Sequence, residues 1–253
     1  CVVTGRRLVL CRPGTAPYWM VVVGDFFAIV VVKMLFGGIG KNFFNPALAA
    51  RAFLFSWPAI MTKFIVPFKS SVIPVFGAVP EEVVDAVSSA TPLTFLKTGT
   101  LPDVSIADLF FGNVGGCIGE VSAAALLLGG FYLLFRKIIT WHIPVCYIGT
   151  VALVTFIFPA SGGFFNLDFM LAELLSGGLL LGAFFMATDY TTSPITSKGR
   201  IIYGIGCGLL TVFLRYFGGY PEGVSYAILL MNVFAFALDK IARPRRYGAG
   251  GEI

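Results

Sequence analysis

Long apolar runs constrain this chain more than any other feature of its sequence. Several reach about 18 residues, the length that a helix rising 1.5 Å per residue needs to cross roughly 30 Å of hydrocarbon. Of the 253 residues, 57% are hydrophobic and 12% are charged, a balance far from that of a soluble domain. The runs are apolar on nearly every face and lack the alternation of barrel strands. The sequence therefore predicts an all-α integral membrane protein built as a polytopic helix bundle.

The apolar runs divide the chain into membrane and loop regions. We expect spans at 17–36, 43–60, 114–136, 141–158, 168–187, 199–217 and 222–242. The chain opens on Cys1 without a signal-peptide pattern, and residues 1–11 look like the end of an earlier helix, so we expect the true N-terminus to lie upstream. Four parts follow: the remainder of a first membrane repeat (1–60), an extracytoplasmic segment (61–113), a second membrane repeat (114–242) and a cytoplasmic tail (243–253).

Basic residues predict which side of the membrane each loop occupies, because short cytoplasmic loops are enriched in Lys and Arg. Three clusters fall on one side if the spans alternate: Arg136 and Lys137; Lys198 and Arg200; Arg243, Arg245 and Arg246. We assign that side to the cytoplasm. The segment 61–113 and the loops "PASGGFFNLD" and "GGYPE" then lie outside. The net charge of +5 records this orientation and gives no support for nucleic-acid binding.

Two span ends resemble each other and suggest an internal repeat. "VVVKMLFGG" at 30–38 and "VFLRYFGG" at 212–219 both end an apolar run with a basic residue and a Gly-Gly pair. If 1–60 and 168–242 are equivalent, the protein consists of inverted five-helix repeats whose first half is N-terminally truncated by two helices. Inverted repeats are common in transport proteins, with a site at the repeat interface. A coincidence between two Gly-Gly ends is the alternative.

The stretch "SSATPL" at 88–93 lies in the longest polar segment. Its simplest interpretation is a helix start, with Thr91 as the N-cap and Pro92 at the first helical position, where no donor is needed. A cap requires only one hydroxyl. It does not explain the further polar residues upstream, Asp85, Ser88 and Ser89.

Three blocks of the sequence carry a resemblance to a known family. "DAVSSATPL" resembles the flavin-attachment motif Asp-x-x-Ser/Thr-Gly-Ala-Thr of the RnfD/NqrB family of membrane subunits. "KMLFGGIGKNFFNPALAARAFL" at 33–54 and "ALDKIARPRRYG" at 237–248 are also similar to that family. The short tail and the position of the motif are closer to RnfD. The resemblance extends over essentially the whole chain.

The resemblance implies a covalent flavin. In the family, a separate flavin transferase links the motif threonine to the phosphate of FMN, and this residue corresponds to Thr91. Asp85, Ser88 and Ala90 occupy matching motif positions, whereas Ser89 stands where the family usually has glycine. That departure adds a side chain where close backbone approach is expected, and it puts efficient attachment in doubt.

The resemblance also implies a function and partners. The chain would be a subunit of an ion-translocating ferredoxin:NAD⁺ oxidoreductase of the Rnf type, relaying electrons at the outer face of a bacterial or archaeal cytoplasmic membrane. Its partners would be an outer-face flavoprotein subunit and membrane iron–sulfur subunits. The same resemblance allows a second, non-covalent riboflavin. The alternatives are the homologous subunit of the Na⁺-translocating NADH:quinone oxidoreductase and a cofactor-free channel or secondary transporter.

Three carboxylates, Asp25, Glu120 and Glu173, fall within predicted spans. Intramembrane carboxylates are costly and generally belong to an ion path or to a buried pair with a basic residue. Arg51 could pair with one of them or with a flavin phosphate.

Asn42 and Asn45 precede Pro46 in a Gly-rich turn. A helix cap followed by proline is the structural interpretation; irregular backbone lining the riboflavin site is the functional one. The five cysteines are scattered without metal-binding spacing, so no metal site is predicted. Arg6 and Arg7 would each cost roughly 2.5–3.5 kcal/mol near the centre of a membrane unless they are paired or face a polar cavity.

Overall fold

The computed structural model describes residues 2–14, 16–38, 40–57, 61, 91–102, 104–219 and 222–242. These residues are predominantly helical, and their only β-type pairing is an isolated bridge between Pro13 and Cys117. The predicted all-α class is confirmed. The predictions for residues 62–90 and 243–253 lie outside the described residues.

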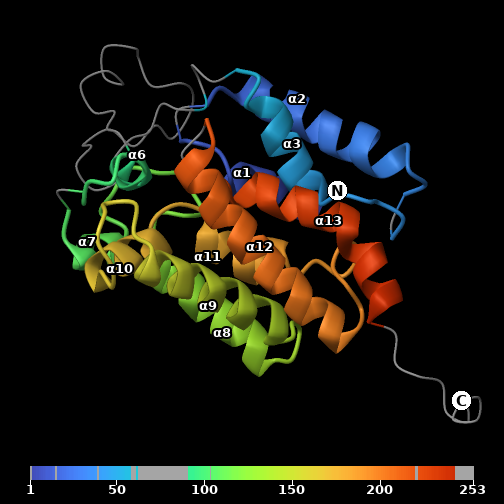
Figure 1. The fold of residues 1–253 in the computed structure, drawn as a ribbon. Coiled ribbons are helices and arrows are strands. Elements are labelled where there is room, and N and C mark those ends of the chain that lie inside the picture. The colour runs from blue at the N-terminus through green and yellow to red at the C-terminus, as the bar shows by residue number, and fades with distance from the viewer. Residues whose placement is uncertain are drawn as a thin grey trace, which may run out of the picture.

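The first group of helices comes from the N-terminal part of the chain. It consists of α1 (Val2–Leu10), α2 (Tyr18–Phe26), which continues directly into the π-helical stretch η1 (Phe27–Met34), and α3 (Pro46–Leu54). These helices pack against one another and, through α3, against α13 (Val224–Ile241). Figure 1 shows this blue group lying beside the red α13.

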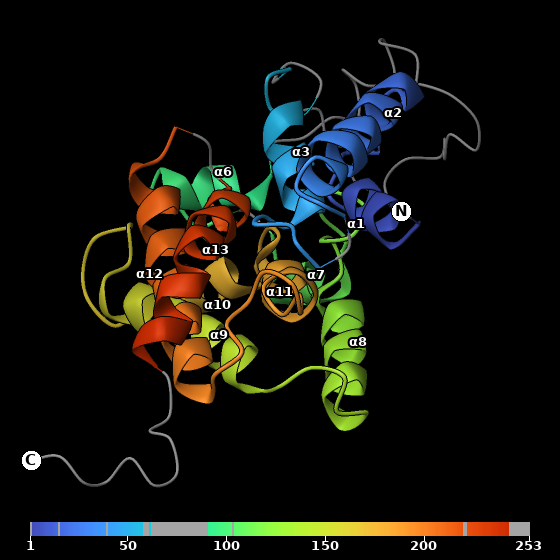
Figure 2. The same ribbon diagram turned by 90° about the vertical axis from the view of Figure 1, so that its right-hand side faces the viewer.

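The remaining helices form the larger part of the molecule. They are α6 (Pro92–Lys97), α7 (Ile106–Phe111), α8 (Ala123–Phe135), α9 (His142–Ile157), α10 (Leu167–Leu175), α11 (Leu179–Leu181), the π-helical η2 (Gly182–Met186), α12 (Ser197–Phe217) and α13. Figure 2 shows α11 nearly end-on, surrounded by the other elements. Its three leucines are at most 5% exposed, so this short helix is a central element of the bundle.

Two helices of the described residues, α12 and α13, are long and apolar enough to cross a membrane by length and composition. A third span is formed if α10 and the α11–η2 unit count as one, although they meet at an angle of 62°. Helices α8 and α9 are apolar but shorter. The predicted spans 17–36, 141–158, 199–217 and 222–242 each match helical structure to within two residues.

Three predicted spans need correction. The span at 43–60 is helical only over Pro46–Leu54, and the span at 168–187 is broken after Leu175. The span at 114–136 begins as a helix only at Ala123. Before that point the backbone pairs with the segment after α1, because Gly119 donates to the carbonyl of Leu10 at 2.8 Å and Ile118 to that of Arg12 at 3.1 Å. Hydropathy registers the apolar character of such a segment but not its non-helical hydrogen bonding.

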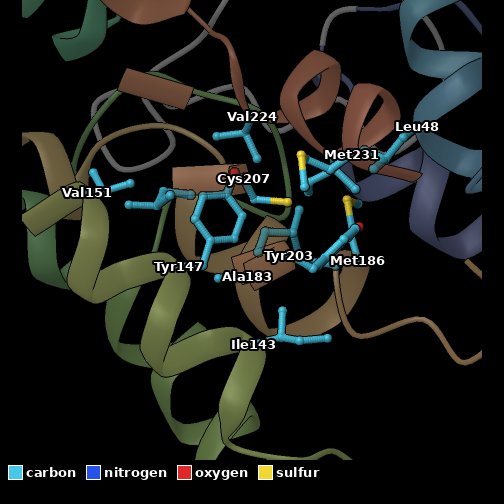
Figure 3. Packing of buried hydrophobic residues seen from close by; sticks show 14 of the residues in the cluster. Leu48, Ile143, Tyr147, Val151, Ala183, Met186, Tyr203, Cys207, Val224 and Met231 are labelled. Carbon is cyan, nitrogen blue, oxygen red and sulfur yellow. The ribbon is translucent and has the colours of Figure 1, made fainter. Parts of the chain in front are cut away.

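The main core lies between α9, α12, η2 and α13, as Figure 3 shows from close by. Gly204 and Gly208 bring α12 close to α9: a Cβ on Gly208 would lie 2.7 Å from the Cβ of Thr150. Small residues four apart are a typical basis for close helix packing in membranes. Tyr147 and Tyr203 are fully buried, and their hydroxyls bond to Thr211 at 2.6 Å and Asn232 at 2.7 Å. Buried hydroxyls are thereby satisfied.

The loops that were predicted to share a membrane side do meet. At one end, the ammonium of Lys97 on α6 donates to the carbonyls of Gly218 (2.6 Å) and Gly219 (2.9 Å), and Tyr216 donates to the carbonyl of Phe158 at 2.9 Å. α6, α7 and the start of α10 lie together at the left of Figure 1. This grouping agrees with the sidedness rule, while the assignment of this end to the outside remains a prediction.

The opposite end gathers the loops predicted to be cytoplasmic. Arg200 lies 3.4 Å from the hydroxyl of Thr140, Asn42 donates to the hydroxyl of Thr191 at 3.2 Å, and Asp239 accepts from the backbone of Ile195 at 3.0 Å.

The two N-terminal arginines have simple structural explanations. Arg6 is exposed, and Arg7 forms an ion pair with Asp189 at 3.3 Å beside a polar cavity. The expected cost of an unpaired charge is therefore avoided at Arg7.

Candidate functional site at a helix break

The centre of the candidate site is the break between α10 and α11. Ser176 has left the helical conformation with ψ of 144°, Gly177 has a φ of +67°, and Gly178 is the N-cap of α11. A positive φ costs glycine little, since it has no Cβ. The sequence "SGG" therefore permits two helical pieces to meet at 62° inside the bundle.

A buried arginine from α12 secures the first piece. The guanidinium of Arg215 forms an ion pair with the carboxylate of Glu173 and donates to the carbonyls of Glu173 (2.7 Å) and Ser176 (3.1 Å). Both residues of the pair are 1% exposed. Carbonyls at a helix end lack intrahelical donors, and Arg215 supplies them here. The sequence allowed Glu173 either an ion path or a buried pair, and the structure shows the buried pair.

A second buried arginine, Arg51 of α3, lies on the other side of the break. It forms an ion pair with Glu222, lies 3.7 Å from Oε2 of Glu120 and donates to the sulfur of Cys117 at 3.4 Å. Arg51 and Glu120 are 2% and 7% exposed. The expectation that Arg51 pairs with one of the intramembrane carboxylates is confirmed.

The two carboxylates beside Arg51 converge on the break. Glu222 accepts from the backbone N–H of Gly178 at 3.1 Å, and Glu120 accepts from that of Cys117 at 3.2 Å. The second oxygen of Glu120 is buried without a hydrogen bond. A Cβ on Gly178 would lie 2.5 Å from Glu222 Oε1 and 2.6 Å from Glu120 Oε2, so glycine leaves room for both oxygens around one point.

Glu222 lies in the loop that joins α12 to α13. Burial raises the pKa of Glu222 to about 7, with Arg51 acting against the rise and Glu120 adding to it. This carboxyl therefore takes up a proton near neutral pH.

A cavity of about 60 Å³ opens onto these groups. Its walls come from α3, α6, α10 and the irregular segments at 113–122 and 176–178, and its polar lining residues are Arg51, Thr91, Cys117, Glu120, Ser176 and Glu222. Cavities for drug-sized ligands occupy roughly 300–1,000 Å³. The cavity is therefore large enough for an ion with water and too small for a flavin ring.

Thr91 stands at this cavity and begins α6. It occupies the N-cap with Pro92 at the first helical position, as the sequence predicts, and its carbonyl accepts from Thr94 at 2.9 Å. The predicted capping bond of its hydroxyl is absent. The hydroxyl instead lies 3.0 Å from that of Thr94. Asp85, Ser88, Ser89 and Ala90 lie outside the described residues.

Asp25 and Asn45 lie away from this cavity. Asp25 faces α1, where a Cβ on Gly5 would lie 3.1 Å from its carboxylate, and one of its oxygens is buried without a partner. Asn45 caps α3 by accepting from Ala47 at 3.1 Å and donates to the carbonyl of Met186 at 3.2 Å, which bears out the interpretation as a cap before proline. A separate cavity of about 150 Å³ adjoins Asn45, again smaller than a flavin pocket. A riboflavin at Asn45 stays a prediction.

Comparison with known proteins identifies the family. The sequence profile of the NQR2, RnfD, RnfE family matches residues 1–248. The chain belongs to this family. Within it, the chain is 49% identical over 253 residues to the D-type component of the Na⁺-translocating ferredoxin:NAD⁺ oxidoreductase complex of Acetobacterium woodii, covering 98% of this chain and 72% of that protein.

Two further relatives from the family agree. The chain is 43% identical over 255 residues to the D-type component of the proton-translocating ferredoxin:NAD⁺ oxidoreductase complex of Clostridium ljungdahlii, covering 97% of this chain and 73% of that protein. It is 40% identical over 272 residues to the D-type component of an ion-translocating oxidoreductase complex of Stutzerimonas stutzeri, with coverage of 98% and 75%. This family member therefore resembles subunits whose complexes are named for different ions.

Several residues of the site escaped the sequence analysis: Glu222, Ser176, Gly178, Arg215 and Cys117. The Pro-Glu-Gly preceding the last span and the Ser-Gly-Gly inside the span 168–187 were the available signals. Within the described residues, no three His, Cys, Asp or Glu side chains are grouped to hold a metal ion.

Proposed function

We propose that the chain is the D-type membrane subunit of an ion-translocating ferredoxin:NAD⁺ oxidoreductase, carrying FMN as a phosphoester on Thr91 and relaying electrons at the outer face. The family match and the names of the relatives support the complex. The motif around Thr91 supports the cofactor.

The observation that carries the cofactor proposal is the state of the Thr91 hydroxyl. A threonine at an N-cap ordinarily spends its hydroxyl on a backbone N–H of the first helical turn. Here Pro92 removes one such donor and no capping bond forms, although the backbone of Thr91 has the N-cap conformation. The partly exposed hydroxyl is left with the neighbouring hydroxyl of Thr94. Esterification would therefore cost the helix no cap.

The residues fit FMN as a tether and do not enclose its ring. Thr91 supplies the ester oxygen, and the size of the adjoining cavity requires the ring to lie outside it. Arg51 lines that cavity but is already paired with two carboxylates, so its positive charge is committed without a phosphate. The bound flavin would supply the electron-transfer chemistry, and this chain would fix its position near the outer end of the bundle.

The exposed apolar surface supports the predicted surroundings. On α8, the side chains of Leu128, Phe131 and Phe135 are 73%, 61% and 86% exposed. Lipid tails or the membrane subunits of the complex would cover such surface. We therefore place the subunit in a bacterial or archaeal cytoplasmic membrane. We assign it an outer-face flavoprotein subunit, iron–sulfur membrane subunits and a flavin transferase as partners.

In-gel fluorescence of the denatured subunit tests the cofactor. A fluorescent band under ultraviolet light is expected from the native complex, and it should disappear in Thr91→Ala. Thr94→Ala is the matched control, because it removes the hydroxyl that contacts Thr91 and should keep the band. Mass spectrometry of the peptide containing Thr91 should show the added FMN. Fluorescence that persists in Thr91→Ala would place the flavin elsewhere.

The broken span favours a second function to be tested beside the first. Discontinuous helices whose ends face a site are typical of secondary transporters. A protein that moves ions without any bound flavin would establish the cofactor-free transporter instead. Activity with quinone rather than NAD⁺ as the acceptor would instead indicate the homologous NADH:quinone complex.

A further inference from the structure

We infer that Glu120, Glu222 and Ser176 form a binding site for one small monovalent cation, a sodium ion or a proton, at the break between α10 and α11. The site lies in the cavity that Thr91 adjoins. Its ligands would be carboxylate and hydroxyl oxygens, the ligand type that hard cations prefer.

The charges at the break require a counter-charge. Two buried guanidiniums, Arg51 and Arg215, face three buried carboxylates. The Arg215–Glu173 pair is balanced, so the excess negative charge belongs to Glu120 and Glu222. Among the described residues, the ion pairs of this region involve no third basic side chain. An uncompensated charge is costly at such burial, and a bound cation or proton removes that cost.

Unpartnered oxygens face the same cavity. Ser176 is 2% exposed and its hydroxyl has no hydrogen-bond partner, although the residue lines the cavity. The free oxygen of Glu120 is in the same state. Buried polar atoms in folded proteins are nearly always satisfied. These two oxygens and the carboxylate of Glu222 thus surround a space of about 60 Å³ with unused acceptor capacity.

The backbone around the cavity has the form of an ion site in a membrane protein. Three non-helical segments meet there, since residues 116–119 pair with the end of α1 and the break at 176–178 lies beside Glu120. Irregular backbone within a membrane bundle is tolerated where it is buried or lines a cavity. Ions bind at such helix interruptions in transporters.

The groups facing the site define its expected pH response. They are Arg51 on α3, Cys11 and Cys117 from the paired irregular segments, Glu120, Glu222, and the Arg215–Glu173 pair. The two thiols are neutral small neighbours. Only the two carboxylates beside Arg51 can exchange a proton for a sodium ion near neutral pH.

The inference rests on the proposed function for its meaning, because it places an ion of an ion-translocating complex within this subunit. Cation binding and flavin attachment nevertheless depend on different side chains. A Thr91→Ala complex should lack the covalent flavin and still bind the cation, so failure of one proposal can be separated from failure of the other.

Reaction with dicyclohexylcarbodiimide tests the site in the assembled complex. This apolar reagent modifies protonated carboxyl groups, and mass spectrometry locates the adducts. We expect adducts on Glu120 or Glu222 in choline chloride at pH 6. If sodium is the occupant, NaCl at equal ionic strength should suppress them. If a proton is the occupant, NaCl should have no effect and the adducts should fall as the pH rises toward 8.

Variants sharpen this test. Glu120→Gln should raise the concentration of NaCl that halves adduct formation on Glu222 by roughly tenfold or more, because it removes a full ligand charge. For a proton site, the same variant should lower the pH midpoint of Glu222 modification. Ser176→Ala should weaken cation protection less than Glu120→Gln. Asp168→Asn, which changes an exposed carboxylate on the same helix, is the control and should change neither midpoint.

Adducts that respond to neither NaCl nor pH would overturn the inference. So would the absence of adducts on both carboxylates across the pH range, since it would show a permanently ionised cluster without an exchangeable cation. Equal midpoints in the native and Glu120→Gln complexes would also overturn it. Native-like assembly of each variant is checked by its retained covalent flavin fluorescence and by size-exclusion chromatography.

Discussion

Two buried arginines stand on either side of one helix break, and their partners differ. Arg215 has one carboxylate, Glu173, and two backbone carbonyls that need donors. Arg51 has two carboxylates, Glu120 and Glu222, and a free carboxylate oxygen remains. The first group is balanced and holds the end of α10. The second has an excess of negative charge and an adjoining cavity. The difference separates a structural ion pair from a candidate binding site.

The largest effect is expected from Glu173→Gln. Breaking a buried ion pair typically costs about 3–5 kcal/mol, because it leaves a buried charge without its partner. We expect a clearly lower melting temperature of the assembled complex, measured by differential scanning fluorimetry. The double variant Glu173→Leu with Arg215→Leu should recover part of the loss. It should not recover all of it, since the carbonyls of α10 then lack their donor. A neutral single variant would contradict the structural role.

Gly178→Ala should have the next largest effect. The new Cβ would lie within 2.6 Å of oxygens from both Glu120 and Glu222, so both carboxylates would have to move. Overpacking of this kind typically costs about 1–3 kcal/mol. Gly149→Ala in α9 is the matched control, because its Cβ would meet nothing within 4 Å. Melting curves of the two variants should therefore move in opposite directions or differ clearly. Equal shifts would show that the break tolerates bulk.

A pH series tests the unusual state of Glu222. Its folded pKa is raised from 4.5 to about 7, so the folded protein binds this proton more tightly than the unfolded chain does. The resulting stabilisation is fully present below 4.5 and is lost as the pH rises to about 7. Native melting temperatures should fall across that window more than those of Glu222→Gln. A shift of about 2–4 °C corresponds to each kcal/mol for a chain of this size. Parallel curves would refute the raised pKa.

The smallest stability effect is expected from Glu120→Gln. The amide keeps the shape of the side chain and can still accept from Cys117, while the excess charge disappears, so the change should stay below about 1 kcal/mol. Its contrast with Glu173→Gln is the sharpest check of the comparison. Similar large losses from both substitutions would mean that the two arginine groups serve the same structural purpose.

The orientation of both groups in the membrane is open to a separate measurement. A membrane-impermeant thiol reagent applied to intact cells should label Thr91→Cys and leave Arg245→Cys unlabelled. The native cysteines Cys11, Cys117 and Cys207 are buried and give little background. Equal labelling from outside would reverse or refute the predicted topology.

Much of the helical architecture was predictable, because it depends on local composition. The spans 141–158 and 199–217 were predicted to within two residues, and the cap at Asn45 followed from Asn-Pro. The span 114–136 was misjudged. Its first nine residues are apolar enough for lipid, yet their N–H groups bond to the segment after α1, a partner about 100 residues away that hydropathy does not register.

The candidate site was predictable only in part. Arg51 and Glu120 were identified because charges within apolar runs are costly, and their pairing was expected. Glu222 was missed because it stands just before a span, where a carboxylate is ordinary. Only the approach of α3 and of the loop after α12 to the break shows that it is buried.

The sequence by itself determined that the chain forms apolar helices, which loops share a side, and which threonine resembles an attachment point, because these properties depend on residue types along a short stretch. The tertiary structure alone decided that Glu120 and Glu222 meet beside Arg51, whereas Glu173 is neutralised by Arg215. The charge balance of a buried site is a sum over residues distant in sequence, and packing fixes which of them contribute to it.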